Sequence, residues 1–186
     1  MNYVYMSQMR LVNHTFRFRA LGDWINQTTD DLFADKKVVL FSLPGAFTPT
    51  CSSQQLPGYE GAFNQFKELG VDEVYCMSVN DAFVMNAWGN AQGIEKIKMI
   101  ADGDGVFTRS MGMLVDKPFQ KFGLRSWRYS AYIVNGEVEK MFIEPGYNNE
   151  GKDDDPFEVS DAETMLTYIR PGDYIRDESI SLERDE

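Results

Sequence analysis

Histidine, cysteine and basic residues are scarce in this sequence of 186 residues, which has one His, two Cys and 18 Lys and Arg against 29 Asp and Glu. The formal charge of −11 repels phosphate backbones and anionic lipids, so neither nucleic acid nor membrane is an expected partner. Two cysteines cannot form a disulfide framework, and a lone histidine gives no zinc-binding spacing. Any thiol chemistry is therefore expected to be reactive rather than structural, and no metal is expected.

Long hydrophobic runs are also absent. The apolar stretch at residues 38–43 is far shorter than the roughly 20 residues that a membrane helix needs. Residues 1–11 contain no apolar segment followed by a cleavage site of small residues, as a secretory leader would. We therefore expect a cytoplasmic protein, and the chain length predicts one domain.

Hydrophobic periodicity predicts alternating strands and helices in the first two thirds of the chain. Residues 37–43 read as a buried strand, and residues 52–69 carry apolar side chains at helical spacing up to Gly70. The pattern repeats with a strand at 71–79, Asn80 and Asp81 as helix caps, and a helix that ends near residue 93. A short strand at 97–100 and a helix at 106–113 follow.

The last third predicts a hairpin and a final helix. Residues 129–134 and 137–143 flank Asn135-Gly136, a dipeptide suited to a tight type I′ turn. After a polar loop at 148–156, Ser160 and Glu163 have the spacing of a capping box. The whole pattern predicts an α/β protein with a thioredoxin-like fold, in which helices flank both faces of a mixed central sheet. The expected boundaries are an N-terminal extension at 1–14, the domain at 15–170 and an acidic C-terminal tail at 171–186.

Cys51 lies where the chain leaves a predicted strand and enters a helix. Reactive groups of α/β sheets gather beyond the carboxyl ends of strands, and a helix N-terminus favours a thiolate. A buried, inert cysteine is the alternative for the residue type alone. The surrounding loop favours reactivity, because Pro44, Thr48, Pro49 and Thr50 make it rigid and place hydroxyls that packing does not require.

Three separated motifs resemble those of a known family. The loop PGAFTPTC at 44–51 is similar to the peroxiredoxin active-site motif, in which threonine follows proline by four residues and cysteine comes three later. FSLPGAFTPTCSSQQLP at 41–57, SVNDAFVMNAW at 78–88 and FGLRSWRYS at 122–130 resemble the type II (atypical, type five) branch. That branch includes glutathione- and glutaredoxin-dependent members and the peroxiredoxin half of hybrid peroxiredoxin–glutaredoxins. The resemblance covers residues 15–168.

The resemblance implies a role for each matching residue. Cys51 would attack a hydroperoxide, Thr48 would hydrogen-bond it, Pro44 would shield the thiolate from water, and Arg128 would hold both sulfur and substrate. It also implies a homodimer and an external thiol reductant, glutathione with glutaredoxin or else thioredoxin, with no bound cofactor.

General energetics indicate why an arginine is needed. A free thiol is only about 3% ionised at neutral pH, and a helix N-terminus stabilises an anion by about 0.3 to 2 kcal/mol. A lower pKa alone gains little rate, since nucleophilicity falls with it. Donors that stabilise the leaving oxygen, such as Thr48 and Arg128, must therefore supply most of the catalysis.

Cys76 is the other thiol, and type II relatives with this spacing have been proposed to use it for resolution. It lies inside the apolar run at 71–79, and a strand ending near Val79 would place it about 10 Å below the edge at which Cys51 is expected. A disulfide needs Cα atoms within about 7 Å, so a one-cysteine cycle is preferred. A two-cysteine cycle with thioredoxin is the alternative.

Other classes of function have weaker support. A thiol-disulfide oxidoreductase would need a second cysteine at position 54, where this chain has Gln54. A redox sensor or chaperone with an oxidisable thiol stays open, and a peroxide-consumption assay would discriminate. His14 is expected to be a surface or packing residue, and neither residues 102–105 nor 153–155 have calcium-ligand spacing.

Overall fold

Strand β4 (Lys37–Leu43) divides the hydrophobic core into two parts. Its side chains alternate between the faces of the sheet, so Val38 and Leu40 pack on one side and Val39 and Phe41 on the other. Cluster one, on the first side, also contains Leu32, Phe33, Tyr75, Phe107, Trp127 and Ile133. Cluster two, on the opposite side, contains Cys51, Tyr59, Phe66, Cys76, Trp88 and Leu166. Burial on both faces explains why this strand is apolar from Val38 to Phe41.

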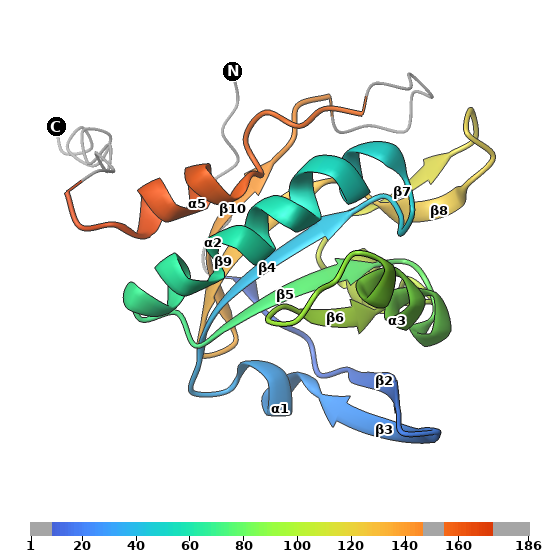
Figure 1. Ribbon diagram of the computed structural model, residues 1–186, viewed down its shortest axis with the longest axis horizontal. Helices are drawn as coiled ribbons and strands as arrows, with labels where there is room; N and C mark the ends of the chain where they lie inside the picture. The colour runs from blue at the N-terminus through green and yellow to red at the C-terminus, as the bar shows by residue number, and fades with distance from the viewer. Residues whose placement is uncertain (1–8, 147–154, 173–186) are drawn as a thin grey trace, which may run out of the picture.

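The computed structural model describes residues 9–146 and 155–172. Its central sheet has six strands in the order β1-β10-β9-β4-β5-β6 (Figure 1). The strands are β1 (Met9–Arg10), β4, β5 (Glu73–Ser78), β6 (Lys98–Ala101), β9 (Tyr129–Val134) and β10 (Glu137–Ile143). β4, β5 and β6 are parallel, whereas β9 is antiparallel to β4 and β10. The mixed sheet and its helices confirm the predicted thioredoxin-like α/β fold.

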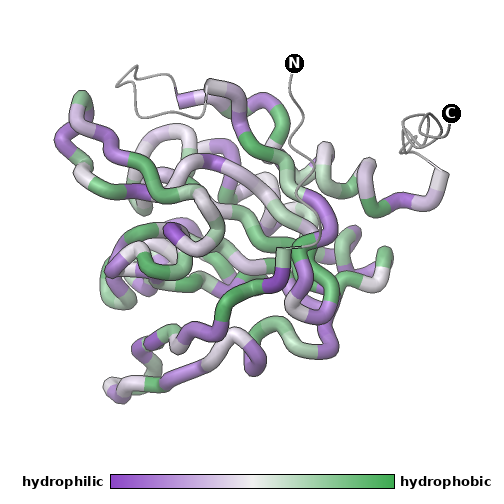
Figure 2. The backbone as a smooth tube through the Cα atoms, turned by 180° about the vertical axis from the view of Figure 1, so that it is seen from behind, coloured by the Kyte–Doolittle hydropathy of each residue, from purple (hydrophilic) through white to green (hydrophobic). Residues whose placement is uncertain are grey.

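Helices cover both faces of this sheet. Cluster two is closed by α2 (Leu56–Glu68), α3 (Ala82–Ala91) and α5 (Ala162–Ile169), and α2 and α5 lie side by side in Figure 1. Cluster one is closed by α1 (Thr29–Phe33) and α4 (Val106–Ser110). Hydrophobic segments run through the middle of the molecule in Figure 2, and many of the turns at its periphery are hydrophilic.

The predicted hairpin at Asn135-Gly136 is confirmed. Both residues have positive φ, 48° and 74°, as the turn requires, and β9 pairs with β10 on either side of them. The predicted cap of α3 is also confirmed, since the Asp81 carboxylate accepts the Val84 N–H. The capping box at Ser160 is wrong by one residue. Asp161 caps α5, because the Ser160 hydroxyl donates instead to the buried carboxylate of Glu144.

Two small hairpins were not predicted. β2 (Thr15–Ala20) pairs with β3 (Asp23–Thr28) and packs against β6 and α3, whereas β7 (Leu114–Lys117) pairs with β8 (Gly123–Ser126) beside β4. The helix expected at 106–113 ends at Ser110, since the chain then turns into β7.

The expected N-terminal extension contributes to the fold from Met9 onward. β1 pairs with β10 at the edge of the sheet, and Leu11 is buried in cluster one. Residues 1–8, most of the polar loop expected at 148–156 and most of the expected acidic tail lie outside the described residues, so the tail boundary stays a prediction. Within the described ranges, no helix has the length and apolar character needed to span a bilayer.

Candidate active site

The loop that follows β4 delivers Cys51 to the start of a helix. Helical conformation begins at Pro49, and the Ser52 N–H donates to the Thr48 carbonyl at 3.0 Å. Cys51 therefore lies in the first turn, where backbone N–H groups have no partner within the helix. Its side chain is fully buried. From Cys51 to Gln55 the helix has π geometry, η1, and the Leu56 N–H closes this wide turn on the Cys51 carbonyl.

Internal hydrogen bonds hold the loop closed. The Thr48 hydroxyl donates to the Gly45 carbonyl at 2.7 Å, which leaves its oxygen free to accept. A side chain on Gly45 would place Cβ 3.0 Å from the Arg125 guanidinium and 3.2 Å from the Thr48 methyl group. Arg125 also donates to the Pro44 carbonyl at 3.5 Å. Glycine therefore permits this close approach of loop and arginine, which a Cβ at this position would push back by a few tenths of an ångström.

Neighbouring elements brace the loop from outside. The Asn80 side-chain oxygen accepts the Ala46 N–H at 3.0 Å and the Ser78 hydroxyl at 2.6 Å. One residue beyond Cys51, the Ser52 hydroxyl accepts the indole N–H of Trp88 at 3.0 Å. These contacts come from the motif at 78–88, so two of the three sequence motifs meet at this loop.

The third motif brings Arg128 to the sulfur. β4 and β9 are antiparallel with Ser42 opposite Tyr129, so Arg128 lies at the edge of the sheet where β4 ends. Its side chain is only 1% exposed, and its Nη1 donates to the Cys51 sulfur at 3.5 Å. Burial works to lower the pKa of Arg128, but the Cys51 sulfur and the Asp155 carboxylate raise it, and the net shift is upward. Arg128 therefore remains a cation beside the sulfur.

Two of the partners of Arg128 were missed by sequence reasoning. Nη1 also donates to the buried Gln55 side-chain oxygen at 2.5 Å, and Nη2 is paired with the Asp155 carboxylate at 2.5 Å. Gln55 follows Cys51 by four residues, a spacing that places both on one face of a helix and could have revealed it. Asp155 lies in the polar loop expected at 148–156, and a polar loop gives no sign of a buried partner.

The buried carboxylate of Glu144 positions Gln55 indirectly, through Ser160. Glu144 accepts the backbone N–H groups of Glu158, Val159 and Ser160 at 2.8 to 2.9 Å, and the Ser160 hydroxyl at 2.7 Å. Ser160 in turn accepts from the Gln55 amide at 3.4 Å, which orients that side chain toward Arg128. Glu144 was not identified from the sequence, because a single glutamate after a strand carries no signal of burial.

Cys76 is buried in the middle of the sheet. It lies on β5 opposite Phe41 of β4, and it belongs to cluster two together with Cys51. The strand ends at Ser78, two residues later, so the expected depth of about 10 Å is corrected to about 7 Å. Burial raises the pKa of the Cys76 thiol well above its usual value, and the nearby Cys51 adds to the shift. Both cysteines are free thiols.

The site thus combines a sulfur at a helix N-terminus, a fixed cation and a threonine hydroxyl in a rigid loop. Such a group can stabilise a thiolate and a negative charge developing on an adjacent oxygen. Among the described residues, the one group of close metal-ligating side chains is His14, Asp102 and Asp104. It is separate from this site, because His14 packs against Phe16 and Phe107 of cluster one.

Comparisons with known proteins agree with this geometry. The Redoxin family model matches residues 14–166. A peroxiredoxin from Synechocystis sp. is 58% identical over 147 residues, which cover 79% of this chain and 77% of that protein. A hybrid peroxiredoxin from Haemophilus influenzae is 55% identical over 168 residues, which cover 90% of this chain and 67% of that protein.

Solved structures give the same result. Reduced Prx3 from Vibrio vulnificus, crystallised in complex with hydrogen peroxide, is 44% identical with a TM-score of 0.78, covering 87% of this chain and 97% of that one. A 1-Cys peroxiredoxin from Plasmodium falciparum is 36% identical with a TM-score of 0.82, covering 88% and 98%. The chain therefore belongs to the redoxin family and is a peroxiredoxin, an enzyme that reduces peroxides at the expense of a thiol.

Proposed function

We propose that Cys51 is the peroxidatic residue and that it works in a one-cysteine cycle with glutathione and glutaredoxin. The observation that carries the first part is the Arg128 guanidinium, buried and 3.5 Å from the Cys51 sulfur. In this geometry the guanidinium stabilises the Cys51 thiolate by direct contact rather than through water. Thr48 lies in the same closed loop, and its hydroxyl oxygen is free to accept a hydrogen bond from the substrate. Pro44 begins that loop and is proposed to exclude water from the thiolate.

The proposed reaction transfers one oxygen atom. The thiolate of Cys51 attacks one peroxide oxygen, the O–O bond breaks, and the leaving oxygen takes a proton to become water or an alcohol. Cys51 is oxidised to a sulfenic acid. Arg128 stabilises the charge on the leaving oxygen, and the gain is largest in the transition state. Thr48, whose hydroxyl proton is donated to Gly45, accepts a hydrogen bond from the peroxide O–H and so orients the substrate. Hydrogen peroxide and organic hydroperoxides are the proposed substrates. The complex of the Vibrio vulnificus relative with hydrogen peroxide supports the first of these.

An external thiol is proposed to complete the cycle. One glutathione condenses with the sulfenic acid, releasing water and leaving a mixed disulfide. Glutaredoxin or a second glutathione then reduces this disulfide and releases the Cys51 thiol. The proposal rests on Cys76, which is fully buried and kept protonated by its raised pKa, so it is a poor nucleophile for resolution. The cycle uses peroxide and thiols alone, so no bound cofactor enters it.

Steady-state turnover with two reductant systems tests the proposal. Peroxide consumption is measured with glutathione, glutaredoxin and glutathione reductase, and separately with thioredoxin and its reductase. Cys51→Ser is expected to abolish turnover, whereas Cys76→Ser is expected to retain it with glutathione and glutaredoxin. Loss of turnover in Cys76→Ser, together with a 51–76 disulfide in oxidised wild type by mass spectrometry, would instead establish a two-cysteine cycle. Failure to consume peroxide with either reductant, despite an oxidised Cys51, would favour a redox sensor.

We also infer a homodimer that associates near the active-site edge, as the resemblance to type II peroxiredoxins implies. Phe47 of the loop and Leu124 of β8 are 55% and 53% exposed, and Arg125 joins their two segments. Exposed apolar side chains around a site favour association. Sedimentation velocity at micromolar concentration is expected to show a dimer, and a monomer alone would contradict the inference. A cytoplasmic location stays a prediction.

A further inference from the structure

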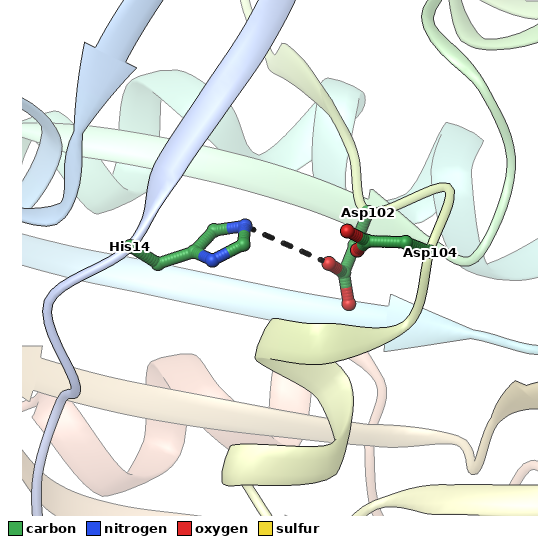
Figure 3. Close-up of side chains that lie close together, drawn as sticks. All are labelled: His14, Asp102 and Asp104. Carbon is green, nitrogen blue, oxygen red and sulfur yellow. Dashed lines mark ion pairs between the residues drawn. The ribbon is translucent and has the colours of Figure 1, made fainter.

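His14, Asp102 and Asp104 bring three metal-ligating side chains together (Figure 3). They lie on the cluster-one side of the sheet, opposite Cys51, because the His14 ring packs against Phe16 and Phe107. His14 precedes β2, whereas both aspartates lie in the turn between β6 and α4. The His14 Nε2 lies 4.0 Å from the Asp102 Oδ1, and one ligand atom from each residue lies within 4.8 Å of the other two. Segments 88 residues apart in sequence therefore converge at one point.

The surrounding contacts hold these side chains in place. The Asp102 carboxylate is fully buried and accepts the N–H groups of Phe107 at 3.2 Å and Thr108 at 2.7 Å. The His14 ring packs edge-on against Phe16 at 4.7 Å, and its backbone exchanges hydrogen bonds with Thr29. Fixed ligands of this kind need little reorganisation on binding an ion.

The group lacks a positive charge. Two carboxylates lie close together, and within the described ranges neither forms an ion pair with a lysine or arginine. In the part of the chain that the structure describes, the one basic side chain within 4.0 Å of either carboxylate is the His14 imidazole, and 4.0 Å is too long for a hydrogen bond. Burying a carboxylate without a cation is costly, and a cation placed between the three side chains would remove that cost.

The dimensions fit a small divalent ion. Three atoms no more than 4.8 Å apart lie at most about 2.8 Å from a point between them, so shifts of well under 1 Å reach the Zn–N and Zn–O distances of about 2.0 to 2.2 Å. A nitrogen donor with two carboxylates suits zinc and other first-row transition ions better than Mg²⁺ or Ca²⁺, which prefer oxygen alone. Asp104 is exposed, which leaves room for water as a further ligand.

We propose that His14, Asp102 and Asp104 form a binding site for a divalent first-row transition ion of the zinc type, separate from the thiol chemistry. The bound ion ties the segment before β2 to the turn before α4. Because the unfolded chain does not hold these residues together, the ion stabilises the folded state in proportion to the logarithm of its free concentration.

The imidazole NMR signals of this chain report on the proposed site alone, because His14 is its only histidine. Tag-free protein carrying Cys51→Ser, which removes the reactive thiol as a competing ligand, is titrated with Zn²⁺. Binding is followed by calorimetry and by the imidazole ¹⁵N signals. One equivalent of Zn²⁺ is expected to shift these signals. Asp104→Asn, which keeps the oxygen that accepts the Val106 N–H, is expected to weaken binding at least about tenfold.

Two further variants complete the design. His14→Gln is expected to abolish tight binding, whereas Asp23→Asn, which removes the same charge at an exposed position of β3, is expected to leave it unchanged. Should His14→Gln fail to fold, Asp104→Asn decides alone. Zinc binding that leaves the imidazole signals unmoved, or that is equal in Asp104→Asn and Asp23→Asn, would overturn the proposal. The absence of binding would also overturn it, since His14 and Asp102 would then be neighbours without a shared ion. So would an equal affinity for Ca²⁺.

Discussion

Replacing Arg128 with alanine is expected to slow the reaction of Cys51 with hydrogen peroxide by about 10²- to 10³-fold. The guanidinium is buried and its Nη1 is 3.5 Å from the sulfur. With an effective dielectric constant of about 20, opposite unit charges at this distance attract by about 5 kcal/mol. The Asp155 carboxylate paired with Nη2 offsets part of this attraction. The measured worth of a hydrogen bond to a charged group, about 1.5 to 3 kcal/mol, is therefore the better guide to the ground state.

The transition state depends on the same group. Loss of one donor to a developing oxyanion costs about 2.7 to 4 kcal/mol, which corresponds to the expected fall in rate. Single-turnover formation of the Cys51 sulfenic acid, trapped with dimedone and counted by mass spectrometry, measures the rate. Arg128→Lys keeps the charge but loses the paired donors, so an intermediate rate is expected.

Arg109→Ala is the matched control, because it removes the same charge from an exposed position at the end of α4. It is expected to react like wild type. A folded Arg128→Ala variant whose rate of sulfenic acid formation stays within about threefold of Arg109→Ala would refute the role of the guanidinium, since no donor to the leaving oxygen would then have been lost.

Three further predictions concern the residues around this pair. Gln55→Ala is expected to slow sulfenic acid formation about tenfold, because Arg128 loses the hydrogen bond to the Gln55 side-chain oxygen. Gln54→Ala, at an exposed position, is expected to leave the rate unchanged, and equal rates in the two variants would contradict the role of Gln55 in positioning Arg128. Glu144→Gln is expected to lower the free energy of unfolding in urea by about 2 to 4 kcal/mol, because it weakens four hydrogen bonds to a buried carboxylate. The exposed Glu68→Gln is the control, and an equal urea midpoint in the two variants would count against the prediction. Burial keeps the pKa of Cys76 above its usual 9.0, so above about pH 9 the unfolded chain releases a proton that the folded chain retains. The free energy of unfolding is therefore expected to decline as the pH rises above about 9, less steeply in Cys76→Ala, and identical slopes would show that Cys76 does not contribute.

The elements with a strong periodic signal were predictable from the sequence. The strand at residues 37–43 matches β4 because both its faces are buried, and Asn135-Gly136 is a turn because both residues adopt positive φ. Proximity of Arg128 to Cys51 was expected from the resemblance alone. It is explained by the antiparallel register of β4 and β9, which no local pattern specifies.

The missed features depend on contacts between distant segments. β2 was not predicted because only Phe16 is buried in it, while Arg17 and Arg19 stack on Trp24 of β3 at the surface. Gln55 looks like an ordinary polar residue of a surface helix, and only the approach of Arg128 and Ser160 makes it part of the site. Ser160 has the sequence of a cap, but the buried Glu144 occupies its hydroxyl.

The register of β9 against β4 limits where this chain tolerates a change in length. Side chains alternate along a strand, so deleting one residue between Tyr129 and Val134 would turn Arg128 to the opposite face and away from Cys51. Residues 118–122, which connect β7 to β8, lie outside the central sheet and can shorten without altering that alternation. In a library of single-residue deletions selected for peroxide resistance, survivors should gather at 118–122 and be missing from β9. The reactivity of the Cys51 sulfur thus depends partly on the number of residues in β9, independent of their identity, because that number decides which face of the sheet Arg128 lies on.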